Sequence, residues 1–124
     1  MYDHIGLKVS DLDASARFYE AALAPLGYVL CSRDASGAGF GPPGAPALWL
    51  YPQTSPAQRS VHVAFRAGSR TAVDRFHAHG VEAGARDNGA PGPRADYGPN
   101  YYAAFLLDPD GNNVEAVCMQ GETP

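Results

Sequence analysis

Three side chains that suit a divalent metal ion occur at matching places in this sequence: His4, His62 and Glu115. Each lies in a short run that alternates apolar and polar residues. Neutral imidazoles and a carboxylate are ligands for Zn, Fe(II), Ni, Co or Mn, and three protein ligands leave coordination positions open for water or substrate. A metal ion held in this way polarises a carbonyl or acidifies bound water. The sequence therefore predicts a metal site, if the fold brings these residues together.

The alternating runs predict strands with two different faces. In residues 4–9, 61–66 and 113–118, successive side chains point to opposite sides of a strand. The apolar side chains of each strand are expected to pack on the helices. The opposite face, which carries the three candidate ligands, is then expected to line a concave surface that could hold a small molecule. Trp49 and Tyr51 are expected on the same face of a further strand. A one-residue slip would reverse these faces, but the apolar sets argue against slippage.

Helical patterns follow the strands predicted at 4–9 and 61–66. Apolar residues recur at helical spacing from Leu12 to Leu26, with Ser10 as the expected N-cap and Gly27 as the terminator. A second helix is expected after Ser69, closed by Gly80. The two halves share a fixed offset of 58 residues, which maps His4, Ala14, Arg17, Phe18 and Tyr19 onto His62, Ala72, Arg75, Phe76 and His77. This match indicates an internal duplication.

The expected architecture is α+β, with two βαβββ modules in a single domain over residues 1–124. Module one is expected over 1–56 and module two over 57–124, with the boundary near 52–60. The mixed strands are expected to curl into a partly open barrel, with the helices on the outside. The run Asp-Pro-Asp-Gly-Asn at 108–112 is typical of a turn and predicts the connection of the last hairpin.

Composition narrows the class of partner. Of 124 residues, 45% are hydrophobic and 18% are charged, which suits a globular domain. The net charge of −4 and the presence of one lysine argue against nucleic acid, and no apolar run approaches the ~18 residues of a membrane span. Cys31 and Cys118 show no disulfide or CxxC pattern. With no signal-peptide pattern at the N-terminus, a cytoplasmic location is expected.

Six further residues are candidate contacts for a small-molecule ligand: Trp49, Tyr51, Phe40, Arg86, Asn88 and Tyr101. The aromatic residues would stack on a flat or apolar ligand, although they would equally serve as core residues. Arg86 and Asn88 would donate hydrogen bonds to an anionic or carbonyl group of the ligand, although the pattern of their segment is equally typical of a turn. The tyrosine-rich loop 96–102 suits either a rim over the site or a dimer contact.

Several of these segments together resemble a known superfamily. They are 3–11 (DHIGLKVSD), 61–65 (VHVAF) and 105–115 (FLLDPDGNNVE). They look like the vicinal oxygen chelate superfamily, the group of glyoxalase I, bleomycin-resistance proteins and extradiol dioxygenases. The resemblance covers essentially the whole chain. It implies paired βαβββ modules, a homodimer, and metal positions at His4, His62 and Glu115. Relatives build the site either within one chain or across a dimer, and the sequence leaves this open.

One position departs from the glyoxalase I pattern. Trp49 stands where those relatives carry a fourth ligand, a glutamate, so a carboxylate base is missing and bound water is the default. In ring-cleaving relatives a catalytic tyrosine is expected near Phe105; Tyr101 and Tyr102 are displaced from it. The expected function is metal-dependent chemistry on a small organic molecule through oxygen chelation, by a lyase, dioxygenase or thiol transferase. The alternative is a non-enzymatic protein that sequesters a drug or metabolite, as bleomycin-resistance relatives do.

Overall fold

A computed structural model describes residues 1–53 and 61–121 of the chain. Most of the predicted module boundary, residues 54–60, lies outside the described residues. The elements, in chain order, are β1 (Ile5–Val9), α1 (Leu12–Leu23), a 3₁₀ turn η1 (Ala24–Leu26), β2 (Val29–Asp34), β3 (Gly37–Gly41), β4 (Leu48–Pro52), β5 (His62–Arg66), α2 (Arg70–Glu82), β6 (Arg86–Pro93), β7 (Tyr102–Leu107) and β8 (Asn113–Cys118).

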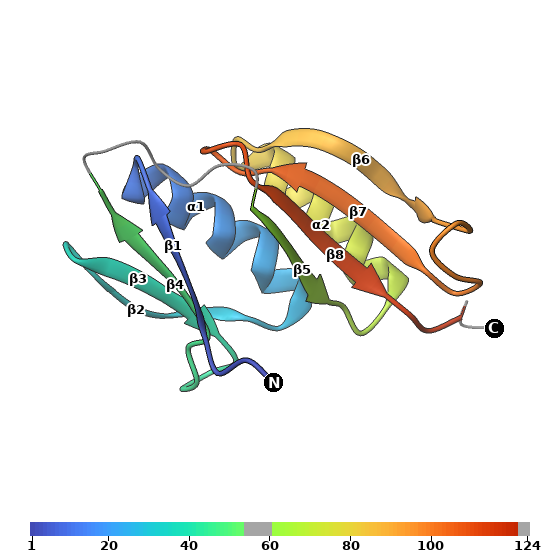
Figure 1. Cartoon of the computed structure of the whole chain (residues 1–124), viewed down its shortest axis with the longest axis horizontal. Coiled ribbons are helices and arrows are strands. Elements are labelled where there is room, and N and C mark those ends of the chain that lie inside the picture. The colour runs from blue at the N-terminus through green and yellow to red at the C-terminus, as the bar shows by residue number, and fades with distance from the viewer. Residues whose placement is uncertain (54–60, 122–124) are drawn as a thin grey trace.

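The described strands form two four-stranded sheets with the same topology. Their orders are β1-β4-β3-β2 and β5-β8-β7-β6, and no closed barrel forms among them. In each sheet the first strand of the module pairs in parallel with the last strand, and the other pairs are antiparallel. The sheets lie side by side with the two helices behind them (Figure 1). The predicted α+β fold with two βαβββ modules is confirmed.

The two helices pack on each other through a glycine. Gly80 of α2 is buried, and a Cβ atom at this position would lie 2.3 Å from Leu106 and 3.2 Å from Phe18. The prediction that Gly80 ends the helix is therefore wrong, since α2 continues to Glu82. Gly84, with φ of 103°, follows the helix instead. Gly80 serves close helix packing, which a pattern of apolar residues does not reveal.

The N-cap of α1 also differs from the prediction. Asp11, and not Ser10, caps the helix by accepting a hydrogen bond of 3.1 Å from the amide of Ala14. The Ser10 hydroxyl instead donates to Asp110, 100 residues later, at 2.6 Å. This partner comes from the turn of the last hairpin, so only the tertiary structure assigns it. Ser69 caps α2 as predicted.

The turn between β7 and β8 connects several elements through a buried carboxylate. Asp108 accepts hydrogen bonds from the Tyr19 hydroxyl at 2.6 Å, from the amides of Asp110 and Asn112 at 2.9 Å each, and from the Asn112 side chain at 3.0 Å. The side-chain oxygen Oδ1 of Asn112 accepts in turn from the amide of Val61 at 3.2 Å. Helix α1, the last hairpin and the residue before β5 are thus held by one polar network.

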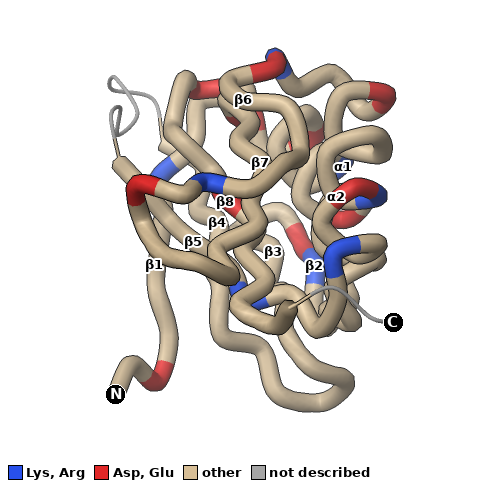
Figure 2. The backbone as a smooth tube through the Cα atoms, turned by 90° about the vertical axis from the view of Figure 1, so that its right-hand side faces the viewer, with Lys and Arg blue, Asp and Glu red and all other residues tan. Residues whose placement is uncertain are grey.

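Charged residues do not gather into a single basic surface along the helices. Acidic and basic positions are interspersed on the helices at the right of Figure 2. Neither helix in the described parts of the chain is long and apolar enough to cross a membrane.

Candidate functional site

The predicted strand phase is confirmed for the last strand. Val114, Ala116 and Cys118 of β8 are buried in the core that the helices cover. The side chain of Glu115 therefore projects from the opposite face of the second sheet. In β5, Val63 is also a buried residue, and the neighbouring His62 has a side chain that is 53% exposed.

His62 and Glu115 lie side by side on this face. The Nε2 atom of His62 is 2.9 Å from Oε1 of Glu115, and the glutamate is only 2% exposed. Two ligand atoms that each lie ~2.1 Å from a metal ion, in adjacent octahedral positions, are about 3 Å apart. The two atoms form a hydrogen bond, and their separation also matches that of neighbouring ligands of one divalent ion.

The second oxygen of Glu115 has a different partner. The Tyr101 hydroxyl donates a hydrogen bond to Oε2. Burial, then the hydrogen bond and the charge of Glu115, raise the pKa of Tyr101 to about 12. At neutral pH this tyrosine is therefore a protonated donor. The ring of Phe105 lies near the imidazole of His62, with 6.5 Å between the ring centres, and forms the neighbouring wall.

His4 lies apart from this pair. It precedes β1, its Nδ1 is 2.6 Å from Oδ1 of Asp3, and it lines a cavity of 320 Å³ with residues 63–65 of β5. Strands β1 and β5 run in opposite directions in Figure 1, and neither His62 nor Glu115 lines the cavity beside His4. In residues 1–53 and 61–121, no three His, Cys, Asp or Glu side chains form a group that could hold a metal ion.

Trp49 and Tyr51 lie against glycines of the adjacent strands. A Cβ atom on Gly39 would lie 2.7 Å from the Trp49 ring, and Cβ atoms on Gly6 and Gly37 would lie 3.1 and 3.3 Å from the Tyr51 ring. Tyr51 remains 41% exposed. These glycines were missed as site residues, although the alternation in residues 37–41 (GAGFG) was a usable signal. The lack of side chains at these glycines leaves room for the two aromatic rings.

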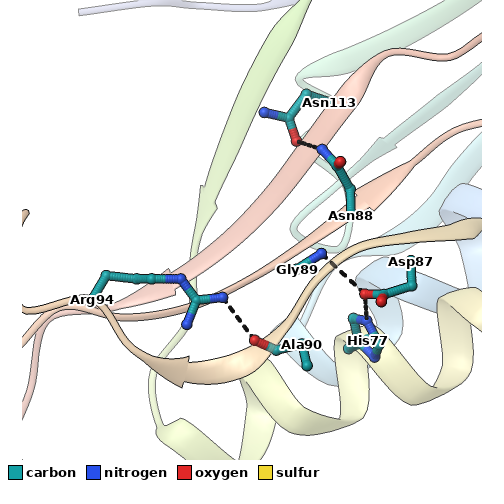
Figure 3. A network of polar contacts seen from close by, with 7 residues as sticks. All are labelled: His77, Asp87, Asn88, Gly89, Ala90, Arg94 and Asn113. Atoms are coloured by element: carbon teal, nitrogen blue, oxygen red, sulfur yellow. Dashed lines mark hydrogen bonds and ion pairs between the residues drawn. The ribbon is translucent and has the colours of Figure 1, made fainter.

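The remaining predicted contacts are spread over the molecule. Phe40 is buried in the core at 1% exposure and also lines the cavity beside His4. Arg86 is exposed at the start of β6. Asn88 donates to Asn113 of β8 at 3.1 Å, which places its amide on the second sheet (Figure 3).

Arg94 is a residue near the site that the sequence did not single out. Its guanidinium lies 5.4 Å from the centre of the Phe105 ring and donates to the carbonyl of Ala90 at 2.7 Å (Figure 3). Arg94 therefore supports the aromatic wall beside His62. Its position depends on the irregular pairing of β6 with β7 between Gly89 and Gly92, which a sequence pattern does not show.

Comparison with known proteins identifies the family and the fold. The sequence matches the glyoxalase-like domain family across residues 4–117. Among solved structures, a glyoxalase/bleomycin resistance protein from Albidiferax ferrireducens T118 is 30% identical, with a TM-score of 0.82, covering 95% of this chain and 98% of that one. A glyoxalase/bleomycin resistance protein/dioxygenase from Nocardioides is 26% identical, with a TM-score of 0.61, covering 98% of this chain and 85% of that one.

Glyoxalase I from Zea mays shares the fold at 22% identity and a TM-score of 0.71; the match covers 99% of this chain and 46% of the maize protein. No curated protein sequence matches the chain. The fold, the paired modules and the family match lead to one assignment. The chain belongs to the glyoxalase-like domain family, within the vicinal oxygen chelate superfamily.

Proposed function

We propose that this protein is a metal-dependent enzyme of the glyoxalase/dioxygenase type, which acts on a small organic molecule through a pair of chelating oxygens. The observation that carries the proposal is that two donors of the kind that bind divalent ions, His62 Nε2 and Glu115 Oε1, lie together on one sheet face, 2.9 Å apart and in hydrogen-bond contact. Zn, Fe(II), Ni, Co and Mn all accept this donor set.

The third ligand, His4, is proposed to come from a second copy of the chain. His4 lines a cavity with residues 63–65 rather than approaching His62, and the strands that follow the two histidines run in opposite directions. A homodimer with two-fold symmetry would pair the first module of one copy with the second module of its partner and so build two equal sites. The protein is proposed to work in the cytoplasm.

Other residues of the chain would contact the ligand and line the pocket. Trp49 and Tyr51, which pack over glycines of the adjacent strands, would stack against the ligand and exclude water. The edge of the pocket would be formed by Arg86, Asn88 and Tyr101. When bound, a divalent ion would supply Lewis acidity to the chelated oxygens. A lyase, a dioxygenase or a thiol transferase would each use this arrangement.

A binding protein that sequesters a drug or metabolite is the second candidate. Two observations favour it. Trp49 pairs with Gly6 at the register position that Glu115 holds against Ala64 in the second sheet, and its ring, like that of Tyr51, packs over glycines of the first sheet. Such a protein would need the aromatic rings but not the metal ligands.

Metal analysis of untagged protein separates the two candidates. We expect near-stoichiometric metal in the wild type, loss of metal in Glu115→Gln and His4→Gln, and wild-type content in His79→Gln, whose residue is an exposed histidine of α2. Equal metal content in all four proteins would contradict the proposed ligand set. Tight binding of a planar ligand by metal-free protein, with no effect of Glu115→Gln, would support sequestration.

A mixing experiment tests whether the site is shared between two copies. In a heterodimer of His4→Gln and Glu115→Gln chains, a shared arrangement leaves one site intact and combines both changes in the other. Random mixing should then restore metal to about a quarter of the sites. A site within one chain would leave every site defective, so no recovery after mixing would refute the shared arrangement.

A further inference from the structure

The two oxygens of Glu115 have separate partners in a nearly closed environment. The residue is 2% exposed, Oε1 faces Nε2 of His62 at 2.9 Å, and Oε2 accepts a hydrogen bond from the Tyr101 hydroxyl. A buried carboxylate is stable only when its oxygens are paired. Tyr101 thus satisfies the oxygen that faces away from His62 and leaves Oε1 beside the imidazole.

Tyr101 is itself held on both sides. Its carbonyl accepts from the amide of Arg94 at 2.7 Å, and its own amide donates to the carbonyl of Gly98 at 3.4 Å. Its ring packs edge-on against Tyr97, with 5.2 Å between the ring centres. The hydroxyl is therefore presented to Glu115 by a loop, residues 94–101, that is closed by its own hydrogen bonds.

We infer that Tyr101 is a positioning residue for the metal site, whose hydroxyl holds Oε2 of Glu115 so that the carboxylate binds the ion through Oε1 alone. The inference rests on the proposed function, because it assumes that Glu115 is a metal ligand. Hydrogen bonds to the outer atoms of a ligand fix its orientation, and their loss typically lowers metal affinity by about 10–100-fold.

Three tyrosines in one short segment provide matched variants. Tyr97, Tyr101 and Tyr102 each lose one hydroxyl on change to Phe, but only the Tyr101 hydroxyl binds Glu115. The Tyr102 hydroxyl donates to Asp74 of α2 at 2.6 Å, and Tyr97 is 64% exposed. Tyr102→Phe and Tyr97→Phe therefore control for the loss of a tyrosine hydroxyl near the site.

The test is titration of the metal-free protein with Co(II), followed by visible absorption. We expect Tyr101→Phe to weaken Co(II) binding by about 10–100-fold and to change the Co(II) absorption bands, because the second oxygen of Glu115 becomes available to the ion. Tyr102→Phe and Tyr97→Phe should keep wild-type affinity and bands. Wild-type affinity and bands in Tyr101→Phe would overturn the inference while the proposed function stood.

Absence of Co(II) binding by the wild type and by all three variants would instead count against the proposed function. The link between Tyr101 and Glu115 is then judged by the ¹³C resonance of the Glu115 carboxylate in metal-free protein. A shift of this resonance in Tyr101→Phe, and none in Tyr102→Phe, would then support only a role of Tyr101 in orienting the Glu115 carboxylate, apart from any metal. An unchanged resonance in Tyr101→Phe overturns it.

Discussion

The Tyr19 hydroxyl of α1 donates a hydrogen bond of 2.6 Å to Asp108, 89 residues later, in the turn between β7 and β8. This bond joins the helix of the first module to the last hairpin of the second. The same turn, through Asn112, holds the amide of Val61, the residue before His62. The position of a candidate metal ligand therefore depends on a buried network that the two modules share.

Replacing Tyr19 with Phe is expected to destabilise the fold. The change leaves the buried carboxylate of Asp108 with one donor fewer, which should lower the free energy of unfolding by about 1–3 kcal/mol. Urea denaturation measures the difference, with Tyr97→Phe as the control because that ring is exposed. Equal stability of the two variants would show that the bond to Asp108 contributes nothing.

The same tyrosine predicts a pH dependence on the alkaline side. Burial, then the charge of Asp108, raises the pKa of Tyr19 well above its ordinary value, so the folded state favours the neutral phenol. A raised pKa of this kind contributes stability below the unfolded value of about 10 and loses it as the pH rises further. Wild-type stability should therefore fall more steeply above about pH 10 than that of Tyr19→Phe. If the stabilities of wild type and Tyr19→Phe fell in parallel in that range, the predicted contribution of Tyr19 ionisation would be wrong.

Gly39→Ala is expected to displace the indole of Trp49. The added Cβ would lie 2.7 Å from the ring, so the ring has to move, and overpacking of this kind typically costs about 1–3 kcal/mol. Because Trp49 is the sole tryptophan, its fluorescence spectrum reports the movement directly. Gly68→Ala is the matched control, since a Cβ atom there meets nothing within 4 Å. An unchanged spectrum in Gly39→Ala would show that Gly39 does not determine the position of the Trp49 ring.

An acid-side dependence is expected from the contact between α2 and β6. His77 Nε2 lies 2.8 Å from Oδ1 of Asp87, and this hydrogen bond, followed by that from the Gly89 amide, lowers the pKa of Asp87 (Figure 3). A lowered pKa contributes stability above the ordinary carboxyl value of about 4 and loses it as the pH falls through the folded value. In His77→Ala the pKa of Asp87 should rise toward the ordinary value.

Titration of the Asp87 carboxyl by ¹³C NMR measures this shift. His79→Ala provides the control, because His79 is an exposed residue of the same helix. A pKa for Asp87 that is the same in wild type and His77→Ala would assign the lowering to the backbone amide of Gly89 alone.

The sequence by itself determined the local features of this protein and its family. Strict alternation fixes which face of a strand each side chain occupies, so the phase of Glu115 opposite Val114 and Ala116 followed from the apolar pattern. The 58-residue offset predicted the duplicated modules, and the two sheets have the same strand order. These features depend on neighbours a few residues away, which a linear pattern records.

Only the tertiary structure decided which distant groups meet. Strand phase predicts His4 and His62 on equivalent faces, but His4 contacts Asp3 and lines a cavity with residues 63–65, while Glu115 comes within 2.9 Å of His62. Ser10 binds Asp110 instead of capping its own helix, and Tyr101 reaches Glu115 from a loop. The physical reason is that these partners are selected by how whole strands and helices pack, and periodicity carries no information on the direction or distance of another element.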